Sequence, residues 1–161
     1  MATLPQLLEE DIQQLDDGLR VLLEKTDATT ALLIDQGGFL LTSQGDSRHF
    51  DLTTIAALAS GAYMATQTIA GLVHETNFNS IYQQGEQYSL YAQRVDDYCI
   101  LVVIFKAQVS VGLVKYYAAP AVEFIARQMT IAQERDPAAT LDLSAINVAD
   151  TRDLFKRRDG S

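Results

Sequence analysis

Cysteine and histidine are nearly missing from this chain, and their scarcity excludes several classes of protein. The single cysteine, Cys99, cannot close an internal disulfide, and the two histidines, His49 and His74, have no further ligand at metal-binding spacing. The chain also lacks a Gly-x-Ser-x-Gly nucleophile elbow and a Gly-x-x-x-x-Gly-Lys-Ser/Thr phosphate loop. We therefore expect no metal site, no cofactor and no enzymatic activity, and we interpret Cys99 as a core residue.

Basic residues are the next shortage. The chain has twelve lysines and arginines in total against 21 aspartates and glutamates, which gives a formal net charge of −9 at pH 7. This balance disfavours nucleic acid, whose phosphates need a basic surface, and it disfavours anionic membranes. The N-terminal run MATLPQLLEEDIQQ has neither the basic region nor the apolar core of a secretion signal. We expect one soluble, cytoplasmic domain without membrane insertion, since 161 residues with a 48% hydrophobic share suffice for one core.

The longest uncharged run lies between Asp51 and His74 and organises the rest of the chain. Its spacing predicts a helix over residues 51–75, with Asp51 as the N-cap. Serine, threonine and glutamine interrupt the run, and it has no aromatic belt or basic flank, so a membrane span is rejected. A helix that is apolar or small on nearly every side must be covered on more than one side.

Two stripes divide this helix. We assign one stripe to the sheet of its own domain, and its members are Leu52, Ile55, Ala59, Ala62, Thr66, Ile69 and Val73. The other stripe has mostly small side chains that allow close approach of a second backbone, and it comprises Ala57, Gly61, Met64, Thr68 and Gly71. Two interpretations stay open: a core helix buried all round, or a helix that packs on its own sheet and also binds protein partners.

The remaining patterns predict an α-β-β-α-β-β-β-α order. Helices are expected over residues 5–25, with an acidic solvated face that includes Asp11, and from a Ser110 cap to about residue 133, with a bend near Pro120. Strands are expected over 29–35, 39–43, 78–84, 87–95 and 98–105. This predicts an α+β fold, a five-stranded antiparallel sheet with helices on both faces. We expect residues 1–136 to form the domain and residues 137–161 to form a C-terminal extension, whose one amphipathic patch is compatible with a short helix.

Three runs within residues 30–117 resemble the roadblock (dynein light chain) family and, within it, the bacterial MglB-type GTPase-activating proteins. They are TALLIDQGGFLLTSQG, then DLTTIAALASGAYMATQTIAGLVHE followed by Phe78, and GEQYSLYAQRVDDYCILVVIFKAQVSVGLVKYY. The resemblance implies a profilin-like fold and a homodimer that binds a Ras-like GTPase of the MglA type on its paired central helices, in cell polarity or motility. It implies that GTP hydrolysis is stimulated by biasing the GTPase's own switch regions, without an arginine finger. A roadblock scaffold without this activity is the alternative.

The resemblance also assigns roles by position. The GTPase-binding positions are Ala57, Gly61, Met64, Thr68, Gly71, Lys115 and Arg127. The dimer interface comprises Leu58, Ala65, Leu72, Phe78 and Ile81, and the contact of the C-terminal extension with the GTPase falls on Leu154 and Phe155. Two stretches depart from the family: Ala118-Ala119-Pro120, where relatives are basic, and Lys156-Arg157-Arg158, where relatives are acidic.

Overall fold

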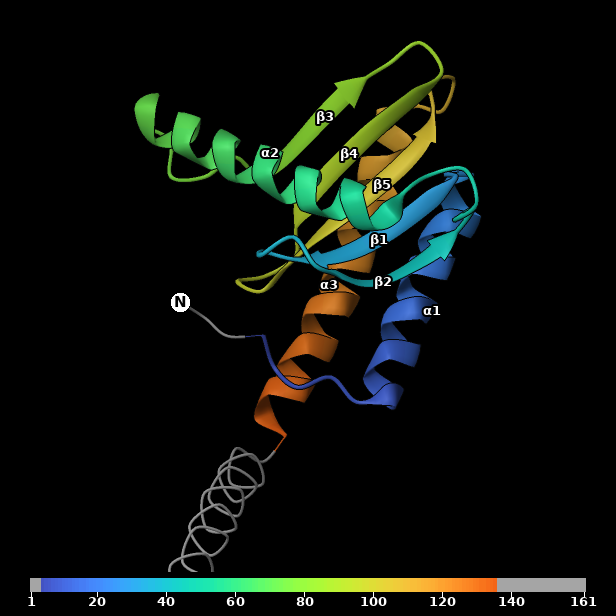
Figure 1. Cartoon of the computed structure of the whole chain (residues 1–161), viewed down its shortest axis with the longest axis vertical. Helices are drawn as coiled ribbons and strands as arrows, with labels where there is room; N and C mark the ends of the chain where they lie inside the picture. The colour runs from blue at the N-terminus through green and yellow to red at the C-terminus, as the bar shows by residue number, and fades with distance from the viewer. Residues whose placement is uncertain (1–3, 136–161) are drawn as a thin grey trace, which may run out of the picture.

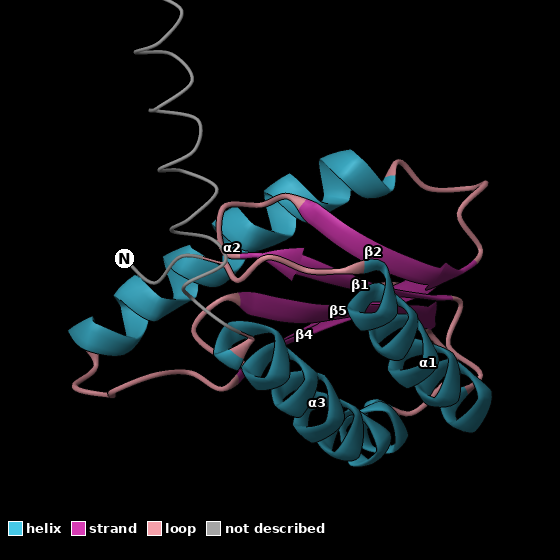
Figure 2. Cartoon of the chain, turned by 90° about the horizontal axis from the view of Figure 1, so that it is seen from below, coloured by secondary structure: helices cyan, strands magenta, loops and turns pink. Residues whose placement is uncertain are grey.

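The computed structural model describes residues 4–135, whose helices and strands follow the predicted order. The helices are α1 (Glu9–Thr26), α2 (Leu52–Leu72) and α3 (Val111–Glu134), and the strands are β1 (Thr30–Asp35), β2 (Leu40–Gly45), β3 (Ser80–Gln84), β4 (Tyr88–Arg94) and β5 (Cys99–Lys106). The strands form one antiparallel sheet in the order β2-β1-β5-β4-β3 (Figure 1). Figure 2 shows α2 on one face of this sheet and α1 with α3 on the other. The predicted fold class is confirmed.

Strand β5 separates two hydrophobic cores. It is buried from Cys99 to Phe105, as expected of a central strand with helices on both sides. Its alternate side chains Leu101, Val103 and Phe105 pack with α1 and α3, whereas Ile100, Val102 and Ile104 pack with α2. Cys99 belongs to the α1–α3 core with no exposed surface, and burial raises the pKa of its thiol. The interpretation of Cys99 as a core residue is confirmed.

Helices α2 and α3 begin at the predicted caps. The carboxylate of Asp51 accepts hydrogen bonds from the hydroxyl of Thr54 at 2.6 Å and from its amide at 3.2 Å, and these bonds lower the pKa of Asp51. The hydroxyl of Ser110 accepts from the amide of Gly112 at 3.1 Å. In both cases a short side chain satisfies amides that the first helical turn leaves free. Helix α2 ends at Leu72, three residues before the predicted end.

Helix α1 differs from the prediction in two ways: it begins at Glu9 instead of residue 5, and Asp11 in its first turn is buried instead of solvated. Its carboxylate accepts from the amide of Leu8 at 2.7 Å, from Gln128 at 2.7 Å and from both terminal nitrogens of Arg135 at 2.6 and 2.7 Å. The Arg135 guanidinium is the main reason that the pKa of Asp11 lies well below its usual range. The bond to Leu8 fixes the helix start at Glu9 instead of residue 5, and the ion pair ties the beginning of α1 to the end of α3.

Pro120 lies inside α3, which continues from Val111 to Glu134 without interruption. The helix therefore tolerates the missing amide donor rather than ending there. A bend of the α3 axis near Pro120 stays a prediction. The buried side of α3 follows the predicted stripe, with Val114, Ala118, Ala121, Ile125, Met129 and Ala132 all buried.

Candidate protein-interaction surface

Helix α2 turns a different side to the sheet than the sequence predicts. Its buried residues are Leu52, Ala56, Ala59, Ser60, Tyr63 and Ala70, whereas Ala62, Ile69 and Val73 of the predicted sheet-facing stripe are exposed. At 100° per residue the buried side is displaced by roughly 70° from the predicted stripe. The assignment is correct for Leu52 and Ala59 and wrong for Ala62, Ile69 and Val73.

Contacts with the β1–β2 turn account for this rotation. The hydroxyl of Ser60 donates a hydrogen bond of 2.7 Å to the carbonyl of Gln36 in that turn. Gly38, at φ +91°, lies so close that an added Cβ would stand 3.0 Å from the Cα of Ala57. Only glycine combines this backbone conformation with such an approach to another helix. These contacts hold the N-terminal half of α2 with the Ala56–Tyr63 side inward.

The opposite side of α2 is exposed and carries no charge from Leu52 to Leu72. Leu58 is 69% exposed and Leu72 is 75% exposed, which are high values for leucine. Figure 1 shows the C-terminal half of α2 projecting beyond the sheet, and its outward side stays exposed within residues 4–135, although Ala70 on its inner side is buried. We call this surface the α2 outer face: Ala57, Leu58, Gly61, Ala62, Met64, Ala65, Thr68, Ile69, Gly71, Leu72 and Val73. The interpretation of α2 as a helix buried all round is therefore wrong for the single chain.

All five α2 positions predicted to bind the GTPase lie on the α2 outer face. An added Cβ at Gly61 or Gly71 would meet no atom within 4 Å, so both glycines border open space. Between them Met64 is 49% exposed, and the hydroxyl of Thr68 donates within the helix to the carbonyl of Met64 at 3.3 Å. The stripe is thus accessible and its polar group already has a partner.

Two of the predicted dimer-interface residues, Leu58 and Ile81, line one groove between α2 and the strands β3 and β4. The groove has a volume of about 250 Å³ and is mainly apolar, with Ile55, Leu58, Ala59, Ala62, Ile81, Gln83, Leu90 and Ala92 around it. Strand β3 forms the sheet edge beside it and pairs only with β4 within residues 4–135. An edge strand next to an apolar groove has free backbone groups for pairing with another chain.

The segment between α2 and β3 is held against α2 through Phe78, another predicted dimer-interface residue. Its carbonyl accepts hydrogen bonds from the hydroxyl of Tyr63 at 3.3 Å and from the side-chain amide of Gln67 at 2.9 Å. Burial raises the pKa of the Tyr63 phenol. These two bonds fix where β3 starts relative to α2.

The predicted basic positions lie elsewhere. Lys115 and Arg127 are exposed on α3, across the sheet from α2, so one protomer does not bring them together with the α2 outer face (Figure 2). Leu154 and Phe155 lie outside the described residues. Sequence reasoning missed Ile69 and Val73 as surface residues, although the uncharged run includes both. It also missed Phe39, which is 72% exposed in the β1–β2 turn beside α2.

Metal clusters and membrane spans are two further features that would bear on function. Across residues 4–135, no three histidine, cysteine or acidic side chains are grouped to hold a metal ion. No helix of that part of the chain combines the length and hydropathy that a bilayer span needs.

Comparison with known proteins identifies the family and the fold of the chain. The family profile of the Roadblock/LC7 domain matches residues 15–105. An MglB with a tetrameric arrangement is 30% identical, with 82% of this chain and 99% of that chain covered and a TM-score of 0.76. The gliding protein MglB of Thermus thermophilus is also 30% identical, with 81% and 98% covered and a TM-score of 0.73.

More distant similarity concerns the fold alone. Profilin IA of Acanthamoeba castellanii is 14% identical, with 70% of this chain and 97% of that chain covered and a TM-score of 0.50. No curated protein sequence matches the chain.

Proposed function

Because the chain belongs to the Roadblock/LC7 family and resembles MglB over about four fifths of its length, we propose that it regulates a Ras-like GTPase of the MglA type. The observation that carries this proposal is the α2 outer face, an exposed apolar surface without a charged residue along 21 residues of helix. Soluble proteins rarely leave a contiguous apolar surface of this kind open unless a protein partner covers it. The name of the gliding protein MglB further supports a role in cell polarity or motility.

The regulator works as a two-fold symmetric homodimer. Helices α2 of two protomers lie side by side, and each β3 pairs across the axis. Support comes from the projecting half of α2, from the free edge of β3, and from the apolar groove between them that Leu58 and Ile81 line. A two-fold axis repeats each contact, so one apolar patch is its own complement. The interface residues are Leu58, Ala65, Leu72, Phe78 and Ile81.

The GTPase binds the small-residue stripe of the paired α2 helices. Gly61 and Gly71 leave open space there, which permits close backbone approach. Helix α2 contains no arginine or lysine, so its contact supplies no guanidinium to the nucleotide. Stimulation then follows from tighter binding of the switch conformation that is competent for hydrolysis, because a partner shifts an equilibrium only by its differential affinity. Contacts of Lys115, Arg127, Leu154 and Phe155 with the GTPase stay predictions.

A matched pair of threonine variants tests the docking face. Thr68 on α2 and Thr130 on α3 are both exposed, and each hydroxyl donates to the carbonyl four residues earlier, at 3.3 and 3.1 Å. Thr68→Arg should weaken binding of an MglA-type GTPase at least about 30-fold, or roughly 2 kcal/mol, because a charge is desolvated at the contact. Thr130→Arg adds the same charge across the sheet and should bind normally when α2 carries the docking; weaker binding of this variant would instead support the predicted contact of Arg127, one turn away on α3.

Biolayer interferometry with immobilised GTPase gives both affinities, and circular dichroism checks that both variants fold. Equal affinities for Thr68→Arg and wild type would contradict docking on α2. Normal wild-type binding without faster GTP hydrolysis would instead identify a roadblock scaffold.

A further inference from the structure

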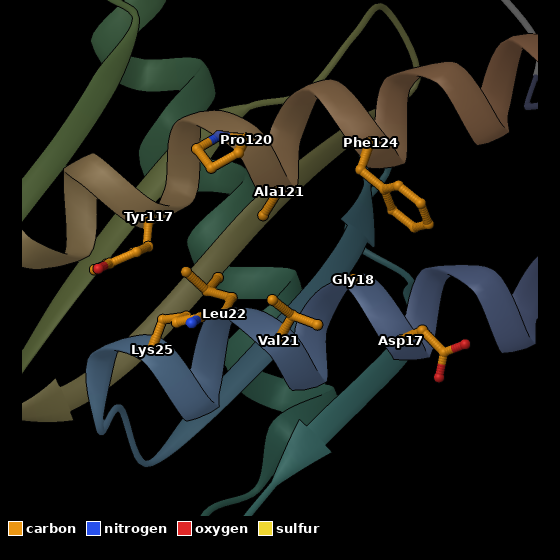
Figure 3. A pocket seen from close by; sticks show the side chains of 9 residues that line it. All are labelled: Asp17, Gly18, Val21, Leu22, Lys25, Tyr117, Pro120, Ala121 and Phe124. Carbon is orange, nitrogen blue, oxygen red and sulfur yellow. The ribbon is translucent and has the colours of Figure 1, made fainter.

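An apolar groove lies between α1 and α3, across the sheet from α2. It has a volume of about 390 Å³, and Figure 3 shows the side chains around it. The lining residues are Asp17, Gly18, Val21, Leu22, Lys25, Tyr117, Pro120, Ala121 and Phe124. Val21 on its rim is 54% exposed, an apolar side chain without a covering partner among residues 4–135.

Small residues on both helices open this groove. An added Cβ at Gly18 would stand 2.9 Å from Cδ1 of Phe124, so the glycine lets that ring lie directly against α1. Ala121 lies on α3 one turn before Phe124, and Val21 lies on α1 one turn after Gly18. Ala121 faces the space between Val21 and Tyr117. The result is a slot whose floor and walls are apolar and whose length follows the two helices.

The chain itself contains a segment of matching chemistry outside the described residues. Leu154 and Phe155 are adjacent large apolar residues, and residues 152–158 include four basic residues and one acidic residue. Helix α1 carries six acidic and two basic residues. Asp11 is buried and paired with Arg135, whereas Asp17 lines the groove together with Lys25 and pairs with Arg20 at 2.7 Å on the surface. Glu24 is exposed one turn from Val21. Two apolar side chains beside a basic run thus fit an apolar slot beside an acidic helix.

The connecting chain is long enough. The ion pair between Arg135 and Asp11 fixes the point where the C-terminal extension leaves α3. Along α3 this point lies roughly 22 Å from Pro120, at about 1.5 Å per residue. The 18 residues 136–153 span roughly 27 Å as a helix and roughly 60 Å when extended, so both conformations reach the groove.

We propose that the groove between α1 and α3 is the docking site of Leu154–Arg158 of the same chain. Leu154 and Phe155 fill the slot, and the three basic residues that follow lie along the acidic side of α1. Docking holds these residues away from a GTPase, so the C-terminal extension has a stored and a released position. Only this last consequence rests on the proposed function; the docking itself does not.

Disulfide trapping in the full-length protein tests the proposal, because buried Cys99 does not compete for oxidation. Asp153→Cys, just before the docking residues, is combined either with Val21→Cys at the groove or with Ile131→Cys near the end of α3. Val21 and Ile131 are 54% and 53% exposed, and Ile131 is closer to the extension along the chain. Docking should make the Val21 pair close at least about tenfold faster, since it raises the local concentration of the thiol. A random extension would favour the Ile131 pair.

Two further readouts make the outcome decisive. Leu154→Ser with Phe155→Ser should remove the advantage of the Val21 pair and leave the Ile131 pair unchanged. Electrophoresis without reductant separates closure within one chain from cross-links between chains. Equal rates for the two cysteine pairs, an advantage that survives the double serine change, or cross-links mainly between chains would each overturn docking in the same chain. No GTPase is present, so failure here is distinguishable from failure of the proposed function.

Discussion

Leu72 offers a sharp test of the homodimer because it is 75% exposed at the last position of α2. Leu72→Ser removes most of its apolar surface without touching the core of the protomer. The stability of the monomer should therefore change by no more than about 0.5 kcal/mol, as is usual for an exposed site. The dimer should respond strongly.

The size of that response follows from the exposed fraction. Full burial of a leucine contributes about 1.5–3 kcal/mol, so burial of the exposed three quarters of Leu72 contributes about 1–2 kcal/mol. A two-fold axis places two copies of the residue in the interface, which doubles the loss to roughly 2–4 kcal/mol. The dimer dissociation constant should rise by about 30-fold to several hundred-fold.

Sedimentation velocity over a dilution series measures this constant, with Ile131→Ser as the control. Ile131 is 53% exposed on α3, across the sheet from α2, and its loss should leave the dimer unchanged. A shift of less than about threefold for Leu72→Ser would refute the α2 interface, since that is below 1 kcal/mol. A large loss of monomer stability would show instead that Leu72 packs within its own chain.

Three further predictions follow from single contacts. Gly61→Arg should abolish GTPase binding in the interferometry assay while the thermal melting temperature stays the same or rises. A Cβ at position 61 meets open space, and an exposed glycine inside a helix costs about 1 kcal/mol relative to better helix formers. Gly38→Ala should destabilise the fold by about 2 kcal/mol or more in urea denaturation, through its φ of +91° and the 3.0 Å approach to α2, whereas Gly37→Ala should cost less than about 1 kcal/mol. Asp11→Asn should lower the melting temperature at pH 7 and flatten its decline below about pH 4. Arg135 lowers the pKa of Asp11 in the folded protein, so the Asp11 carboxylate contributes its full stabilisation above the usual aspartate pKa. This stabilisation is lost only as the pH falls toward the pKa that Asp11 has in the folded protein. Melting temperatures that are the same for the variant and wild type at every pH would contradict this role of the ion pair.

Local chemistry explains what the sequence predicts well. Asp51 and Ser110 act on amides two or three residues away, so their caps are visible in the sequence itself. The apolar run of β5 likewise requires cover on both faces, which identifies it as a central strand. The exposed small-residue stripe of α2 follows from the same kind of periodic pattern.

Long-range contacts explain what the sequence leaves open. Apolar residues lie on nearly every side of α2, so hydropathy does not select the side that faces the sheet. The bond from Ser60 to Gln36 and the close approach of Gly38 make that choice. Asp11 and Arg135 are 124 residues apart, and no periodic pattern links them. An acidic residue in an acidic run is ordinarily solvated, which is why its burial could not be anticipated.

The most direct test of the proposed function is single-turnover GTP hydrolysis by an MglA-type GTPase, with this protein titrated in. With wild type and with Thr130→Arg, we expect the hydrolysis rate to rise with protein concentration to at least about ten times the basal rate, which corresponds to a barrier lower by about 1.4 kcal/mol. Thr68→Arg should leave the GTPase at its basal rate. A basal rate at saturating wild-type protein, or full stimulation by Thr68→Arg, would contradict a GTPase regulator that acts through the α2 outer face.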